Sequence, residues 1–139
     1  MKHTLKTFVL TIALLFSTPA WAEGVDGNSF LCTSDEHAMP SAINFINGRV
    51  IYNDGALSLQ SYYSADDTRV QWMGTLKELG KTTAIRFEIN RKNLKLLKQY
   101  NTFYYIYLQC EFMEFSEALR IVQIAWEKLK SEAQKGNQF

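Results

Sequence analysis

The stretch over residues 102–112, with the sequence TFYYIYLQCEF, constrains the fold more than any other part of the chain. Successive side chains of a strand point to opposite faces, so Leu108 and Cys110 share one face of an extended chain. The opposite face begins with the aromatic residues Tyr105 and Tyr107 and ends with polar residues. A strand that is apolar on both faces for half its length is usually covered on both sides, so we place this strand centrally in a sheet.

An amphipathic helix is predicted directly after this strand, over residues 116–135. Apolar residues recur there at three- and four-residue spacing, which indicates a single buried stripe. The stripe consists of Phe115, Ala118, Leu119, Val122, Ala125, Trp126, Leu129 and Ala133. Ser116 suits the N-cap, and lysines gather toward the C-terminal end, where they complement the helix dipole. We expect this helix to cover the back of the preceding strand.

Short alternating segments separated by turns fill most of the chain before this strand. Asn47-Gly48 is the dipeptide most typical of a two-residue type I′ hairpin turn. Short turns favour antiparallel neighbours, because a parallel pair needs a crossover of about a dozen residues or more. The sequence therefore predicts a mainly β (α+β) fold, an antiparallel β-meander or small barrel of about seven to eight strands with one C-terminal helix.

Residues 1–22 have the features of a signal peptide. Lysines near the start precede an apolar run over residues 8–16, and an A-x-A motif occupies residues 20–22. The apolar run is shorter than the ~20 residues that a membrane helix needs, and no later segment reaches that length. We expect a single β-rich domain over residues 23–139, exported to the periplasm or secreted, with no transmembrane span in the mature chain.

Two cysteines, Cys32 and Cys110, remain after the signal peptide. An even pair in an exported chain commonly forms a disulfide, and the alternative is two buried free thiols. Two isolated cysteines and the single remaining histidine, His37, lack the paired spacing of a zinc site, so we expect no metal and no cofactor. Without Lys2 and Lys6 the chain carries one more acidic than basic side chain, which argues against a nucleic-acid partner.

Two groups of residues are candidate binding sites. A basic cluster could attract an acidic protein, a glycan or headgroups, although charge that keeps exposed edges soluble is the alternative. An aromatic group could line a pocket, although core and cross-strand packing explains most such residues. The basic group consists of Arg86, Arg91, Lys92, Lys95 and Lys98, and the pocket group of Trp72, Tyr105, Tyr107 and Trp126.

Residues 34–37, with the sequence SDEH, form the one place where acidic, imidazole and hydroxyl groups crowd together. Consecutive loop residues cannot all point at one ion, so a solvated loop is the simpler interpretation of Asp35, Glu36 and His37. The sequence has no G-x-S-x-G elbow, P-loop or G-x-G-x-x-G motif, so we expect no catalytic residues and no enzyme activity.

The order of these motifs resembles that of small exported bacterial proteins of no assigned function. In those proteins a signal peptide leads to an early Cys, a β-meander, an INRxxLxL hairpin, a last strand ending in Cys and a charged C-terminal helix. Here INRKNLKL covers residues 89–96, and Cys110 lies in the last predicted strand. The resemblance implies a fold and no activity.

We therefore expect an exported, non-enzymatic binding or interaction domain that uses an exposed sheet face or the basic cluster. The first alternative is a lipocalin-like carrier of a small apolar ligand, held between the curved sheet and the helix. The second alternative is an enzyme or metal binder that uses Asp35, Glu36 and His37.

Overall fold

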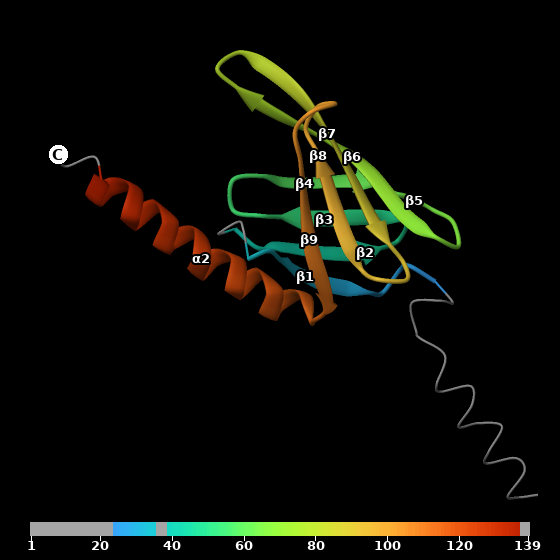
Figure 1. The fold of residues 1–139 in the computed structure, drawn as a ribbon. Helices are drawn as coiled ribbons and strands as arrows, with labels where there is room; N and C mark the ends of the chain where they lie inside the picture. The colour runs from blue at the N-terminus through green and yellow to red at the C-terminus, as the bar shows by residue number, and fades with distance from the viewer. Residues whose placement is uncertain (1–23, 36–38, 137–139) are drawn as a thin grey trace, which may run out of the picture.

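The computed structural model describes residues 24–35 and 39–136, which form one sheet and one helix (Figure 1). The predicted signal peptide over residues 1–22 lies outside these residues. The strands are β1 (Ser29–Thr33), β2 (Ser41–Ile46), β3 (Arg49–Asn53), β4 (Ser58–Tyr62), β5 (Ser64–Ala65), β6 (Arg69–Glu78), β7 (Lys81–Asn90), β8 (Lys95–Gln99) and β9 (Tyr105–Phe112). The helix is α2 (Phe115–Gly136). The prediction of a mainly β, barrel-like fold with a C-terminal helix is confirmed.

The sheet consists of two antiparallel meanders. Its strand order is β4-β3-β2-β1-β9-β8-β7-β6-β5. Strands β1 to β4 form one meander and strands β5 to β9 form the other. The two meanders are joined by hydrogen bonds where β1 pairs with β9. In the first meander, Asn47 and Gly48 have φ values of 53° and 75°, the left-handed conformation that a type I′ turn requires at both positions.

The barrel is nearly closed on the side where β4 faces β6. These two strands approach each other without being hydrogen-bonded neighbours. The side chain of Leu59 on β4 lies over Gly74 on β6, where a Cβ would come within 2.4 Å of Leu59 Cδ2. The absence of a side chain at Gly74 therefore lets the two strand edges come together, with side-chain packing in place of backbone pairing.

Large side chains fill the interior of the barrel. Phe30, Phe45, Tyr52 and Phe87 are fully buried, and the Trp72 ring stacks on Phe87 with a centroid distance of 5.2 Å. Alternation along the strands explains this core, because every second residue of the pleated sheet points inward. The centre of the barrel is therefore packed with side chains.

Helix α2 packs on the outer face of β1 and β2, and its C-terminal half extends past the sheet (Figure 1). Ala118 and Val122 are buried against Leu31 and Ala42 on these strands. The prediction that the helix covers β9 is wrong, and the outward tyrosines of that strand are 54% exposed. Within the described residues, no helix combines the length and apolar character needed to cross a membrane.

Candidate functional site

A cleft of about 310 Å³ opens at one end of the barrel, between the sheet and α2. Its apolar wall residues come from the segment before β2, the β3–β4 loop, β9 and α2, and its polar residues come from the ends of β3 and β8. The wall consists of Met39, Ala56, Ile106, Leu108 and Leu129, and the polar residues are Asp54, Lys98 and Tyr100. An apolar hollow with a few convergent polar groups is typical of a small-molecule site.

The β3–β4 loop is held in place by Asp54. One carboxylate oxygen, Oδ1, accepts the backbone N–H of Leu57 at 2.8 Å, and the Asp54 N–H donates to the Leu57 carbonyl at 3.0 Å. Gly55 has a φ of 90°, and a Cβ there would lie 2.9 Å from two atoms of the Trp126 indole. Only glycine suits this position, because it permits both the left-handed backbone and the close approach of the helix.

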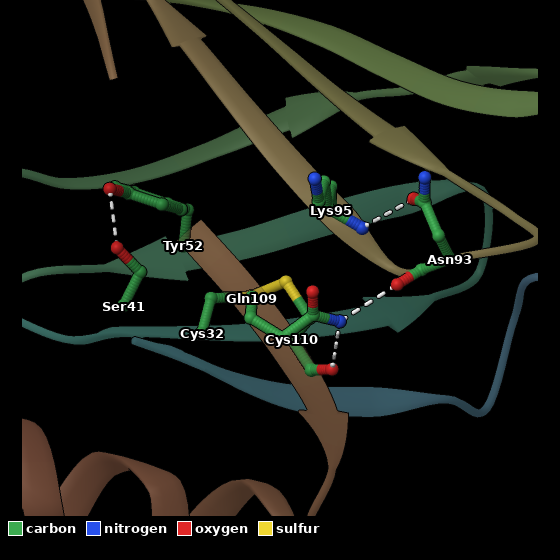
Figure 2. The surroundings of a disulfide bond; sticks show 7 residues. All are labelled: Cys32, Ser41, Tyr52, Asn93, Lys95, Gln109 and Cys110. Carbon is green, nitrogen blue, oxygen red and sulfur yellow. Dashed lines mark hydrogen bonds between the residues drawn. A yellow bond between two sulfur atoms is a disulfide. The ribbon is translucent and has the colours of Figure 1, made fainter. Parts of the chain in front are cut away.

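A buried polar cluster forms the floor of the cleft. Lys98 Nζ lies 3.0 Å from Asp54 Oδ2, and the Tyr52 hydroxyl donates to the same oxygen at 2.8 Å. The Ser41 hydroxyl contacts the Tyr52 oxygen (Figure 2) at a distance of 2.9 Å, and donates to it because the phenol proton is used in the bond to Asp54. Lys98 is 6% exposed and Asp54 8%, so the ion pair is almost fully removed from solvent.

The electrostatics of this cluster are balanced. Burial raises the pKa of Tyr52 well above its usual range, and the nearby Asp54 carboxylate raises it further. The phenol is therefore neutral at physiological pH, and the cluster holds one ammonium and one carboxylate. Breaking such a buried pair from one side leaves an uncompensated charge, which is strongly destabilising. The ion pair is thus a fixed part of the structure.

The structure corrects the interpretation of Lys98 as part of an exposed basic cluster. Lys98 points into the barrel because it lies two residues after the buried Leu96 on β8, and residues two apart share a face. Its ammonium is paired with Asp54. Sequence reasoning missed this buried cluster, although the alternation along β8 was a signal for the inward direction of Lys98.

The other four basic residues do not form one surface patch with it. Arg86 donates through Nε to Gln99 Oε1 at 3.1 Å, across the β7–β8 pair. Arg91 donates to a backbone carbonyl in the turn before β6 at 2.7 Å. Lys92 and Lys95 are exposed. The predicted basic cluster is therefore divided between cross-strand contacts, a loop contact and two solvated lysines.

The predicted pocket residues lie in three different places. Trp72 is in the core of the barrel, Tyr105 and Tyr107 face outward on β9, and Trp126 lies on α2 against Gly55. They do not surround a common space. Trp126 is near the cleft, because Gly55 is flanked both by its indole and by Met39, which lines the cleft.

The loop predicted to be the second alternative site is only partly described. Asp35 lines a separate hollow of about 270 Å³, together with Lys95 and Tyr107. Glu36 and His37 lie outside the described residues. The hollow lies beside Lys95 on β8 and Tyr107 on β9. It differs from the cleft between the sheet and α2 in its lining, because only Leu108 is common to both.

The predicted disulfide between Cys32 and Cys110 is present. The two residues are directly opposite each other on β1 and β9, with Cα atoms 3.9 Å apart (Figure 2). Next to it, Gln109 Nε2 donates to the Asn93 carbonyl at 2.7 Å, which ties β9 to the turn before β8. The disulfide therefore joins the two meanders at the place where they are hydrogen-bonded.

No family model matches the chain, and neither a curated protein nor a solved structure matches it.

Proposed function

We propose that this chain is an exported, non-enzymatic binding domain whose site is the cleft between the barrel and α2. The observation that carries this proposal is the Lys98–Asp54 pair, which is buried at the floor of an otherwise apolar cleft. Export is supported by the disulfide, because such bonds persist in oxidising compartments.

A small ligand with an apolar body fits this cleft best. The volume of about 310 Å³ is at the lower end of the range of roughly 300–1,000 Å³ for small-molecule sites. The wall residues come from the sheet, two loops and the helix, so they can surround an apolar body on several sides. The ligand lies at the end of the barrel, unlike that of a lipocalin, because aromatic side chains occupy the centre.

The test is a substitution that fills the cleft. Leu129 lines it from α2 and is 36% exposed, so Leu129→Trp adds bulk there without burying a new group in the core. Ile124→Trp is the matched control, because Ile124 is an apolar residue of the same helix that is 57% exposed and does not line the cleft.

Binding is measured by titration with the uncharged apolar fluorescent probe N-phenyl-1-naphthylamine, and by native mass spectrometry of protein purified without detergent. We expect saturable one-to-one binding by the original chain and by Ile124→Trp. We expect Leu129→Trp to bind at least ~10-fold more weakly, a difference of ~1.4 kcal/mol. Equal affinities of all three proteins for the probe, or no saturable binding by the original chain, would refute the proposal.

A further inference from the structure

We propose that the cleft selects a ligand whose head is an uncharged hydrogen-bond acceptor, such as an ester carbonyl, attached to an apolar chain. This inference rests on the proposed function and specifies the chemical class of the ligand. It depends on the hydrogen-bonding capacity and the charge that remain at the floor of the cleft.

The Lys98 ammonium has hydrogen-bond donors that the ion pair with Asp54 leaves unused. Lys98 Nζ carries three protons, and among the described residues its one hydrogen bond goes to Asp54 Oδ2. Asp54 already accepts from Tyr52, Lys98 and the Leu57 N–H. A ligand head that accepts a hydrogen bond therefore finds a partner in Lys98, whereas an ammonium head competes with Lys98 for Asp54.

The charge at the floor argues against an anionic head. The titratable groups that line the cleft are Asp54, Lys98 and Tyr100, and Tyr52 lies behind them. The ammonium and the carboxylate cancel each other, and the Tyr52 phenol is neutral. A carboxylate head would add a second negative charge beside Asp54 in a poorly hydrated place, which costs more than its hydrogen bond to Lys98 returns. An ester carbonyl accepts the same hydrogen bond without adding charge.

The apolar walls indicate where the chain of the ligand lies. Ile106 and Leu108 line the cleft from β9, and Leu129 lines it from α2. Met39 adds a flexible thioether, which adapts easily to ligands of different shape. A chain that starts at Lys98 can therefore run outward between the sheet and the helix.

The experiment compares three ligands of equal chain length on the original protein by isothermal titration calorimetry at pH 7. Methyl octanoate has an uncharged acceptor head, octanoate an anionic head and octylammonium a cationic donor head. We expect methyl octanoate to bind at least ~10-fold more tightly than either charged ligand. In the double variant Lys98→Met/Asp54→Leu, which replaces the ion pair by apolar side chains of similar size, we expect methyl octanoate to lose ~5-fold in affinity with its hydrogen bond.

The ranking on the original protein does not depend on whether the double variant folds. Octanoate or octylammonium binding as tightly as methyl octanoate would overturn this inference and leave the cleft itself as a binding site. Failure of all three ligands to bind would overturn both this inference and the proposed function.

Discussion

Removing the disulfide is the perturbation whose effect follows most directly from the structure. In the double variant Cys32→Ala/Cys110→Ala, the covalent link between β1 and β9 is lost while both strands keep their backbone pairing. Both cysteines are buried in the native protein. We therefore expect the fold to persist and the free energy of unfolding to fall.

The magnitude follows from the length of chain that the disulfide closes. Cys32 and Cys110 are 78 residues apart. In the chain-entropy model a loop of that length restricts the unfolded chain by about 15 cal/mol/K, which is about 4.5 kcal/mol at 25 °C. A domain of this size has a free energy of unfolding of about 5–15 kcal/mol, so the variant is expected to be only marginally stable.

Urea unfolding followed by tryptophan fluorescence measures this change. With an m value of about 2 kcal/mol/M, the midpoint should fall by about 2 M. The control is a reductant, which should lower the midpoint of the original chain by a similar amount and leave that of the double variant unchanged. If the free energy of unfolding of the double variant fell by less than about 1 kcal/mol, the disulfide would not act by restricting the 78-residue loop in the unfolded chain, and this account would be refuted.

Three further experiments test the buried cluster and the β4–β6 contact. Lys98→Met should lower the free energy of unfolding by about 3–5 kcal/mol because Asp54 is left unpaired. Adding Asp54→Leu should restore only part of it in urea titrations, because the hydrogen bonds from the Leu57 N–H and the Tyr52 hydroxyl to Asp54 are lost. Equal losses in the single and double variants would contradict this account. Gly74→Ala should cost about 1–3 kcal/mol through its clash with Leu59, and in a double-mutant cycle with Leu59→Ala the two costs should not add; additive costs would exclude the contact. Because the pKa of Tyr52 is raised in the folded state, the neutral phenol contributes fully to the free energy of unfolding below the unfolded-state pKa of about 10. This contribution is lost as the pH rises toward the folded-state pKa, with a slope of about 1.4 kcal/mol per pH unit. Tyr52→Phe should flatten the decline in stability between pH 10 and 11, and an unchanged slope would refute the assignment.

Much of the fold could be predicted from local patterns. Asn47-Gly48 specifies its turn because both residues tolerate the left-handed conformation. The short alternating segments and the three- and four-residue spacing in α2 indicated the correct type of element, since each pattern reflects which side of one element is buried. The pairing of Cys32 with Cys110 followed from the number of cysteines and the expected compartment.

The candidate site could not be predicted in the same way, because it depends on contacts between distant elements. Lys98 and Asp54 are 44 residues apart, and only the curvature of the sheet brings the end of β8 next to the β3–β4 loop. The predicted position of α2 was wrong because local periodicity shows which face of a helix is buried, but not which surface it packs against. Leu31 and Ala42, far from the helix in sequence, supply that surface.

Helix α2 covers the cleft from a position outside the loop that the disulfide closes. The helix follows Cys110, so it lies outside the ring of chain that the sulfur–sulfur bond closes, and it is tethered through residues 113–114 alone. Only Ala118 and Val122, near its start, are buried; Trp126 is half-buried against Gly55, and residues 127–136 are exposed. Detachment of the helix would therefore break its contacts with β1, β2 and Gly55 but none of the pairings between strands. Amide protons of α2 should accordingly exchange with solvent before those of β1 and β9, and a bound molecule that bridges helix and sheet should slow that exchange.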